Sequence, residues 1–252
     1  MSFASLSTHI AVLATVLWTS FAHASSRKTP WLYSPNIMNV GEVEYEQYTT
    51  WKTNKQSDSE YSEVRFRHSI EWGAAENLQM AVYFADWRYK KTSEGSDTYF
   101  HDVAVEAIWQ LQAPTPDDVG IGLYGEIKYG DDFFELEGKL LFEMELDQVN
   151  ILYNCTLEAE WEGQHLDDDK GVLENAIAVT YAPEPNLTYG IQAIWEIEFP
   201  GWSQQSDDVV YVGPSIAWQS EGWWITISPL FQATNVQSEP DLQVRLLFGI
   251  DF

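Results

Sequence analysis

The chain has 252 residues, a length that fits one or two domains, and no shift in composition marks a boundary between two. Its 39 acidic and 13 basic residues give a formal net charge of −26. This charge argues against nucleic acid as a partner, because phosphate binding needs a basic surface, and it favours cationic partners. A single cysteine, Cys155, excludes an intrachain disulfide framework.

The first 24 residues have the layout of an export signal. An apolar run at residues 10–21 is followed by Ala22, His23 and Ala24, which form an A-x-A cleavage site. The preceding residues depart from the usual pattern, since they contain no Lys or Arg. The apolar run is too short to span a membrane as a helix, and no other segment approaches the ~20 continuous apolar residues that such a helix needs.

Residues 25–40 show no regular alternation, and Pro30 and Pro35 exclude a long regular element there. Strand patterns begin after them and are clearest at residues 133–161. In that stretch apolar and charged residues alternate with a period of two, which is the period of a β-strand, and a tight break at Gln148 divides it into two runs. At ~3.3 Å per residue and a tilt of ~45°, runs of this length would cross the ~25 Å apolar band of an outer membrane.

The same pattern predicts twelve strands, an even number as in bacterial single-chain barrels. They are expected at residues 42–52, 62–72, 77–89, 99–111, 118–129, 133–146, 149–161, 172–182, 187–199, 208–218, 223–233 and 241–252. Connections after odd strands are mostly long and polar, and those after even strands are short. We therefore expect long outer loops at residues 53–60, 90–98, 162–171, 200–207 and 234–240, with the short connection at 130–132 as an exception.

The last strand alternates from Leu242 to the terminal Phe252. In this strand, in the export signal and in the general pattern, the chain resembles Gram-negative outer-membrane β-barrel proteins. The resemblance implies an all-β, transmembrane antiparallel up-and-down barrel of about twelve strands at residues 41–252, inserted into outer-membrane lipid. It also implies that Phe252 is an assembly signal read by the barrel assembly machinery. Residues 1–24 are then a signal peptide, and residues 25–40 are a periplasmic leader or a segment inside the lumen.

Tryptophans lie close to the predicted strand ends, where amphipathic rings settle at a bilayer interface. They predict an aromatic girdle; its members are Trp51, Trp72, Trp87, Trp109, Trp161, Trp195, Trp218 and Trp223.

If the apolar faces point to lipid, the acidic faces line the lumen. The predicted lining residues are Glu42, Glu44, Glu135, Glu137, Glu143, Glu145, Glu158, Glu160 and Glu196, with Arg65, Arg67 and Arg245 among the few inward cations. Carboxylates in such excess cannot all pair, and leaving them unpaired in a dry interior is costly, so the lumen should hold water or cations. The predicted function is a channel that passes small cations or small hydrophilic solutes.

Three alternatives remain open at this stage. Residues 25–40 or an inward loop could occlude the tube, with Arg27, Lys28 and Lys52 offsetting part of the charge, which would leave a structural or surface-interaction barrel. A soluble secreted β-sandwich could bury the same apolar faces. A barrel-borne lipid hydrolase is disfavoured because His68 points to lipid, Ser69 points the other way and Asn175 is several strands distant.

No cofactor fingerprint is present, so neither a cofactor nor an enzymatic activity is predicted. The acidic loop at residues 165–169 offers oxygen ligands that suit calcium or magnesium, but it does not match the EF-hand spacing. Acidic residues on neighbouring strands could also hold divalent ions, and the sequence leaves this question open.

Overall fold

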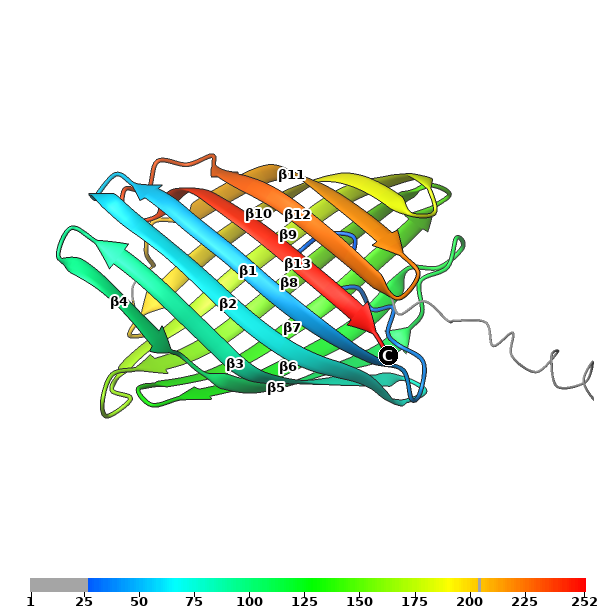
Figure 1. The fold of residues 1–252 in the computed structure, drawn as a ribbon, viewed down its shortest axis with the longest axis horizontal. Coiled ribbons are helices and arrows are strands. Elements are labelled where there is room, and N and C mark those ends of the chain that lie inside the picture. Colours follow the sequence, from blue (N-terminus) through cyan, green and yellow to red (C-terminus); the bar gives the residue numbers. More distant parts are fainter. Residues whose placement is uncertain (1–26, 204) are drawn as a thin grey trace, which may run out of the picture.

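We describe a computed structural model of the chain, covering residues 27–203 and 205–252. These residues form a closed antiparallel β-barrel (Figure 1). The strands are β1 (Val43–Lys55), β2 (Asp58–Ala75), β3 (Leu78–Thr92), β4 (Gly95–Phe100), β5 (Val103–Gln112), β6 (Gly120–Gly130), β7 (Phe133–Leu146), β8 (Val149–Glu162), β9 (Asp168–Glu184), β10 (Leu187–Pro200), β11 (Val209–Ser220), β12 (Trp223–Gln232) and β13 (Pro240–Asp251). The predicted signal peptide lies outside the described residues.

Closure comes from the pairing of the first strand with the last. β1 pairs with β13 on one edge and with β2 on the other. β4 and β5 both pair with β3, so together they occupy the place of one barrel strand that is interrupted between Phe100 and Val103. The ring therefore has twelve strand positions, and the predicted fold class is confirmed.

Side chains alternate across the wall as the sequence pattern requires. Apolar side chains such as Leu140, Ile177 and Ile191 are 46%, 47% and 57% exposed on the outside, whereas Glu106, Glu126 and Glu174 are buried on the inside. A continuous apolar exterior on a closed sheet suits hydrocarbon, because closure pairs the first and last strands and leaves no free edge between them. Among the described residues, no helix is long and apolar enough to cross a membrane.

The connections correct part of the loop prediction. β1 ends at Lys55 and β2 begins at Asp58, while β3 and β4 leave only Ser93 and Glu94 between them. The loops expected at 53–60 and 90–98 are therefore tight hairpins. Polar side chains do not interrupt a backbone ladder, and these strands extend beyond the apolar band. The longest connections on this side follow β8, β10 and β12, and we take it as the outer end.

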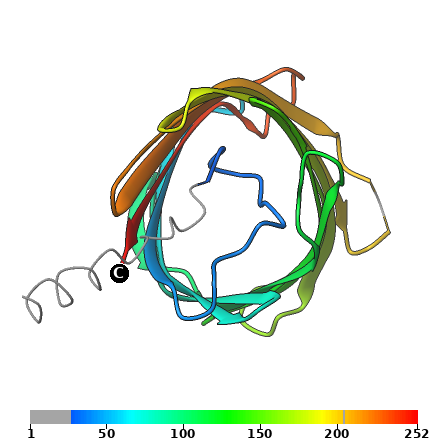
Figure 2. The same cartoon turned by 90° about the vertical axis from the view of Figure 1, so that its right-hand side faces the viewer.

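Residues 27–39, here called the plug, lie inside the barrel (Figure 2). They enter the lumen, turn back and leave along β2, where Val40 forms an isolated parallel bridge with Gly73. A Cβ added at Gly73 would stand 2.0 Å from the carbonyl oxygen of Asn39, so a glycine is needed for this close passage. Of the two places predicted for this segment, the structure shows the lumen.

Candidate functional site: a charged cavity closed by the plug

A cavity of about 290 Å³ occupies the outer half of the lumen. Strands β1 to β3 and β6 to β10 contribute its walls, and Pro30, Trp31 and Tyr33 of the plug also line it. Eight glutamates and seven Lys or Arg side chains face this space. The cavity is therefore highly charged and nearly balanced in formal charge.

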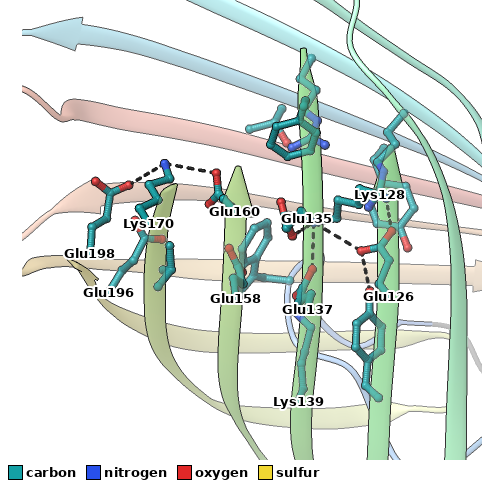
Figure 3. Close-up of a pocket in the computed structure, with 18 of the residues that line it drawn as sticks. Glu126, Lys128, Glu135, Glu137, Lys139, Glu158, Glu160, Lys170, Glu196 and Glu198 are labelled. Atoms are coloured by element: carbon teal, nitrogen blue, oxygen red, sulfur yellow. Dashed lines mark hydrogen bonds and ion pairs between the residues drawn. The ribbon is translucent and has the colours of Figure 1, made fainter. Parts of the chain in front are cut away.

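One wall carries most of the carboxylates and three lysines (Figure 3). The Lys128 ammonium donates to Glu135 at 2.5 Å and to Glu137 at 2.8 Å. Lys139 pairs with Glu137 from the next inward position of β7. Each lysine thus neutralises part of a larger group of acids on neighbouring strands.

Lys170, at the beginning of β9, joins two further carboxylates of this wall. Its ammonium lies 3.2 Å from Glu160 and 3.2 Å from Glu198 (Figure 3). By contrast, Glu158 and Glu196 have no hydrogen bond or ion pair within the part of the chain that the structure describes. Glu162, which also lines the cavity, has no such bond in these residues either, so the acidic wall presents three unpaired carboxylates.

The opposite wall is basic. Arg65 donates through Nε to Asp86 at 2.7 Å and lies 3.7 Å from Asp102, while Arg88 approaches Asp86 at 3.8 Å. Arg67 pairs with Glu126 on β6 and stacks over the ring of Tyr83, 3.6 Å from its centre. Three guanidinium groups thus meet three carboxylates, but Asp86 and Asp102 do not line the cavity, so the surface that this wall presents is mostly cationic.

Lys52 adds to the basic wall from β1. Within residues 27–203 and 205–252 its ammonium has neither a hydrogen bond nor an ion pair. It lines the cavity together with Arg65 and Arg88. The basic wall therefore presents an unpaired ammonium group, as the acidic wall presents unpaired carboxylates.

Ion pairs hold the beginning of the plug. The Arg27 guanidinium lies 3.4 Å from Glu46 and 3.6 Å from Glu71, and it donates to the Tyr48 hydroxyl at 3.1 Å. Lys28 pairs with Glu143, which also accepts from Ser34. The side chains of Arg27, Lys28 and Ser34 thus all contact carboxylates in the periplasmic half of the wall.

Hydrogen bonds and apolar packing hold its middle. The Tyr33 backbone N–H donates to Asn154 Oδ1 at 2.7 Å, and Asn154 Nδ2 donates back to the Tyr33 carbonyl at 2.9 Å. The Trp31 indole donates to Glu174 at 2.7 Å. Leu32 is only 1% exposed and packs on an apolar patch of the inner wall that includes Leu152 and Ile194.

Below the cavity, three tyrosine hydroxyls converge on one carboxylate. Tyr83, Tyr33 and Tyr124 donate to Glu106 Oε2 at 2.6, 3.1 and 3.1 Å. Because Tyr33 belongs to the plug and the other two tyrosines to the wall, this cluster joins the plug to β3, β5 and β6. The plug therefore contacts the wall on several sides of the barrel.

The predicted lining residues divide into two groups. Seven of them line the outer cavity: Glu135, Glu137, Glu158, Glu160, Glu196, Arg65 and Arg67. The other five lie against the plug or below it. Glu143 and Glu145 face Lys28, Glu42 accepts from Asn39, Glu44 accepts from the Trp224 indole, and the Arg245 guanidinium stacks 3.3 Å above Trp31. Their predicted role in selectivity remains a proposal.

Sequence reasoning missed Asp86 and Arg88. Strict alternation through β3 would place them on the lipid-facing side with Val82 and Phe84. A bulge in the β2–β3 pairing leaves Phe84 as an extra residue without a partner on β2, so the side chains after it point to the opposite side of the wall. Two charged residues at positions that alternation assigns to lipid are the sequence signal that could have revealed this bulge. Lys170 was missed because the ninth strand was predicted to begin at residue 172, whereas β9 begins at Asp168.

The residues considered for lipid hydrolysis do not assemble. His68 shares a 2.7 Å hydrogen bond with the Tyr45 hydroxyl, and Asn175 accepts from Tyr153 at 2.6 Å. They lie on β2 and β9, which are not neighbours in the sheet, and Ser69 is buried.

Two groups of potential metal ligands occur in the described residues. Oxygens of Glu135, Glu158 and Glu160 lie within 4.8 Å of one another, and so do ligand atoms of Asp86, His101 and Asp102. Lys128 already occupies the first group, and three arginines surround the second, so neither group is assigned to a metal here. The acidic loop at residues 165–169 forms no such group among the described residues.

Several solved outer-membrane barrels have a similar fold. The COG4313 outer membrane channel from Pseudomonas putida F1 aligns with a TM-score of 0.65 and 10% identity, over 86% of this chain and 98% of that one. The NanC porin aligns with a TM-score of 0.54 and 9% identity, over 82% and 98%. LpxR from Salmonella typhimurium aligns with a TM-score of 0.53 and 7% identity, over 83% and 100%.

At such low identity these similarities show the fold, and they confirm the resemblance to outer-membrane β-barrel proteins. No curated protein sequence matches the chain. Residues 24–238 match the model of a family of unknown function, DUF6662. Since this match spans most of its length, the chain belongs to the family DUF6662.

Proposed function

We propose that the protein is an outer-membrane channel for small hydrophilic solutes that carry a positive charge, and that the plug restricts passage through it. The outer cavity provides a vestibule, and the plug separates it from a second cavity of about 20 Å³ that is lined by Arg27, Glu44, Glu46 and Glu71. A space of that size holds about one water molecule. The described conformation is accordingly a closed or nearly closed state.

The observation that carries the proposal is the distribution of charge along the lumen. Carboxylates outnumber cationic groups by eight to seven in the outer cavity and by three to one in the smaller cavity. Arg27, the single cation of the smaller cavity's lining, belongs to the plug. Displacing the plug would leave the periplasmic half strongly acidic, and acidic linings attract cations and repel anions.

The way the plug is held supports a movable closure. Its contacts are ion pairs, hydrogen bonds and the buried side chains of Leu32, Tyr33 and Met38, and its residues form no strand with the wall, the isolated bridge at Val40 lying just after them. Individually, such contacts stabilise by about 0.5–3 kcal/mol, so several must break together for the lumen to open. Opening that needs many such contacts to break at once is expected to be rare.

Planar-bilayer recording in a potassium chloride gradient tests the charge preference. The expected reversal potential corresponds to preferential passage of potassium, both for the full chain and for a variant that lacks residues 27–39. The variant with the plug deleted should show the stronger preference, because Arg27 and Lys28 are removed. A reversal potential on the chloride side would contradict the proposal.

A second function is favoured by one observation. The many contacts of the plug are also those of a permanently closed barrel, which would act through its outer surface. Recordings from the full chain separate these two functions: openings of any duration support a channel, and their complete absence at all voltages supports a structural barrel.

A further inference from the structure

The charges of the outer cavity are separated by sign across the lumen. Lys52, Arg65, Arg67 and Arg88 come from the adjacent strands β1, β2 and β3, whereas most of the carboxylates come from β7 to β10. In the ring of twelve strand positions, β9 lies opposite β2. A solute in this cavity therefore has a basic surface on one side and an acidic surface on the other.

Each surface keeps charged groups that form no ion pair of their own within the protein. On the basic side Lys52 forms no hydrogen bond or ion pair among the described residues, and Arg88 shares Asp86 with Arg65. On the acidic side Glu158 and Glu196 are unpaired within the same residues, although Lys128, Lys139 and Lys170 are all engaged nearby. Glu63 stands opposite Lys52 in the β1–β2 pairing, and the two side chains form no ion pair in the described residues.

We propose that this cavity is a binding site for a small zwitterion of the α-amino acid class. The carboxylate of the solute faces Lys52 and Arg88, and its ammonium group faces Glu196 and Glu158. A simple cation would satisfy only the acidic side, and a simple anion only the basic side, so the pair of walls selects a solute that carries both charges.

The size of the cavity sets an upper limit on the solute. At about 290 Å³ it lies at the lower end of the ~300–1,000 Å³ typical of small-molecule pockets, which suits an amino acid better than a larger molecule. Pro30, Trp31 and Tyr33 of the plug supply apolar and aromatic surface at the cavity, against which a short side chain can pack. This inference deepens the proposed function, because it names the class of solute.

The test is a binding measurement by saturation-transfer NMR on the full chain in detergent, with four probes of nearly equal size. They are L-alanine, a zwitterion; L-alaninamide, a cation; L-lactate, an anion; and lactamide, which is neutral. L-Alanine should bind most tightly, by about tenfold over each singly charged probe, because it makes charge-assisted contacts on both sides.

Two substitutions identify the walls. Lys52→Met should weaken the binding of L-alanine and of L-lactate about tenfold and leave the binding of L-alaninamide unchanged. Glu196→Gln should weaken the binding of L-alanine and of L-alaninamide and leave the binding of L-lactate unchanged. Lys91→Met and Glu60→Gln are matched controls, since these residues form an exposed 3.1 Å ion pair on the outer hairpins. Neither control should alter binding, and heat-dependent gel mobility shows that each variant is folded.

The outcomes separate this site from the channel. Equal binding of all four probes, or loss of L-alanine binding in the control variants, overturns the zwitterion site even if bilayer recordings show conductance. Preferential L-alanine binding that both wall substitutions reduce supports the site. If that binding occurs in a barrel that never conducts, the site stands and the proposed channel falls.

Discussion

Glu143 illustrates how the role of a lumen residue depends on what fills the lumen. Its place in the alternating pattern of β7 predicts an inward carboxylate that is available to passing cations. The structure does place it inside, with a relative exposure of 1%. There it binds Lys28 and Ser34 of the plug. In the structure this residue therefore holds the plug.

Replacing this anchor should favour the open state. We expect Glu143→Gln to raise the open probability in bilayer recordings by about tenfold, since a charge-assisted contact at a buried position is weakened. Glu145→Gln is the matched control on the same strand, because Glu145 is partly exposed and lies 4.0 Å from Lys28. An equal effect of both substitutions would contradict the anchor.

The side of the wall to which a side chain points could be predicted on regular strands, and the prediction failed on irregular ones. Alternation alone placed Glu135, Glu137 and Glu160 on the inside, and all three line the cavity. It failed for Asp86 and Arg88, because a bulge depends on the register of two paired strands and leaves no direct mark in the sequence of one. Burial and pairing of these two charges emerge only from the fold.

Strands and plug differ in what their sequences reveal. The strand pattern was strong because one face meets lipid and the other meets polar groups, so a register slip of one residue would reverse every side chain. Boundaries were less certain where polar residues continue the ladder, as at Lys55 and Asp58. The plug has no periodicity, and its position depends on contacts with many strands, such as those to Glu46, Asn154 and Gln79.

If the plug must move for solutes to pass, tying it to the wall should stop passage. We expect a Ser34→Cys and Glu143→Cys pair, in a Cys155→Ser background, to be joined by a short bis-methanethiosulfonate cross-linker, since the Ser34 hydroxyl contacts the Glu143 carboxylate and the linker makes up for the shorter cysteine side chain. Cross-linking should then abolish openings in bilayer recordings, and reduction of the two mixed disulfides should restore them. The two single-cysteine variants are the controls, and conduction by the fully cross-linked protein would contradict movement of this segment.

The whole barrel depends on the apolar belt around its wall. Leu140 lies near the middle of β7 and is 46% exposed, with Leu123 and Cys155 beside it on the neighbouring strands. Tyr129 lies near the outer end of β6 and is 60% exposed. Both side chains are on the outside, and they differ in depth along the barrel axis.

Arginine at these two positions should reveal the membrane. Leu140→Arg should lower the free energy of unfolding in lipid vesicles by about 2–4 kcal/mol, and Tyr129→Arg by about 0–1 kcal/mol, because the cost of a charge falls toward the interface. Reversible denaturant titration measures both values. Equal and small effects would contradict the assignment of this surface to hydrocarbon.

The last residue of the sequence lies at the seam of the barrel. The backbone N–H of Phe252 donates to the Val43 carbonyl at 2.9 Å, so the last residue lies at the seam where β13 meets β1, and its side chain is 81% exposed. An exposed aromatic ring at the closing seam is suitably placed for recognition by an assembly factor. That role of Phe252 remains a prediction.

The most direct measurement of the central claim compares the single-channel conductance of the full chain with that of a variant lacking residues 27–39, in the same bilayer and salt. The barrel wall closes through β1 and β13 without the plug, so the variant retains its ring of strands. We predict long, stable openings in the variant and brief or rare openings in the full chain. A folded variant that conducts no better than the full chain would contradict the account.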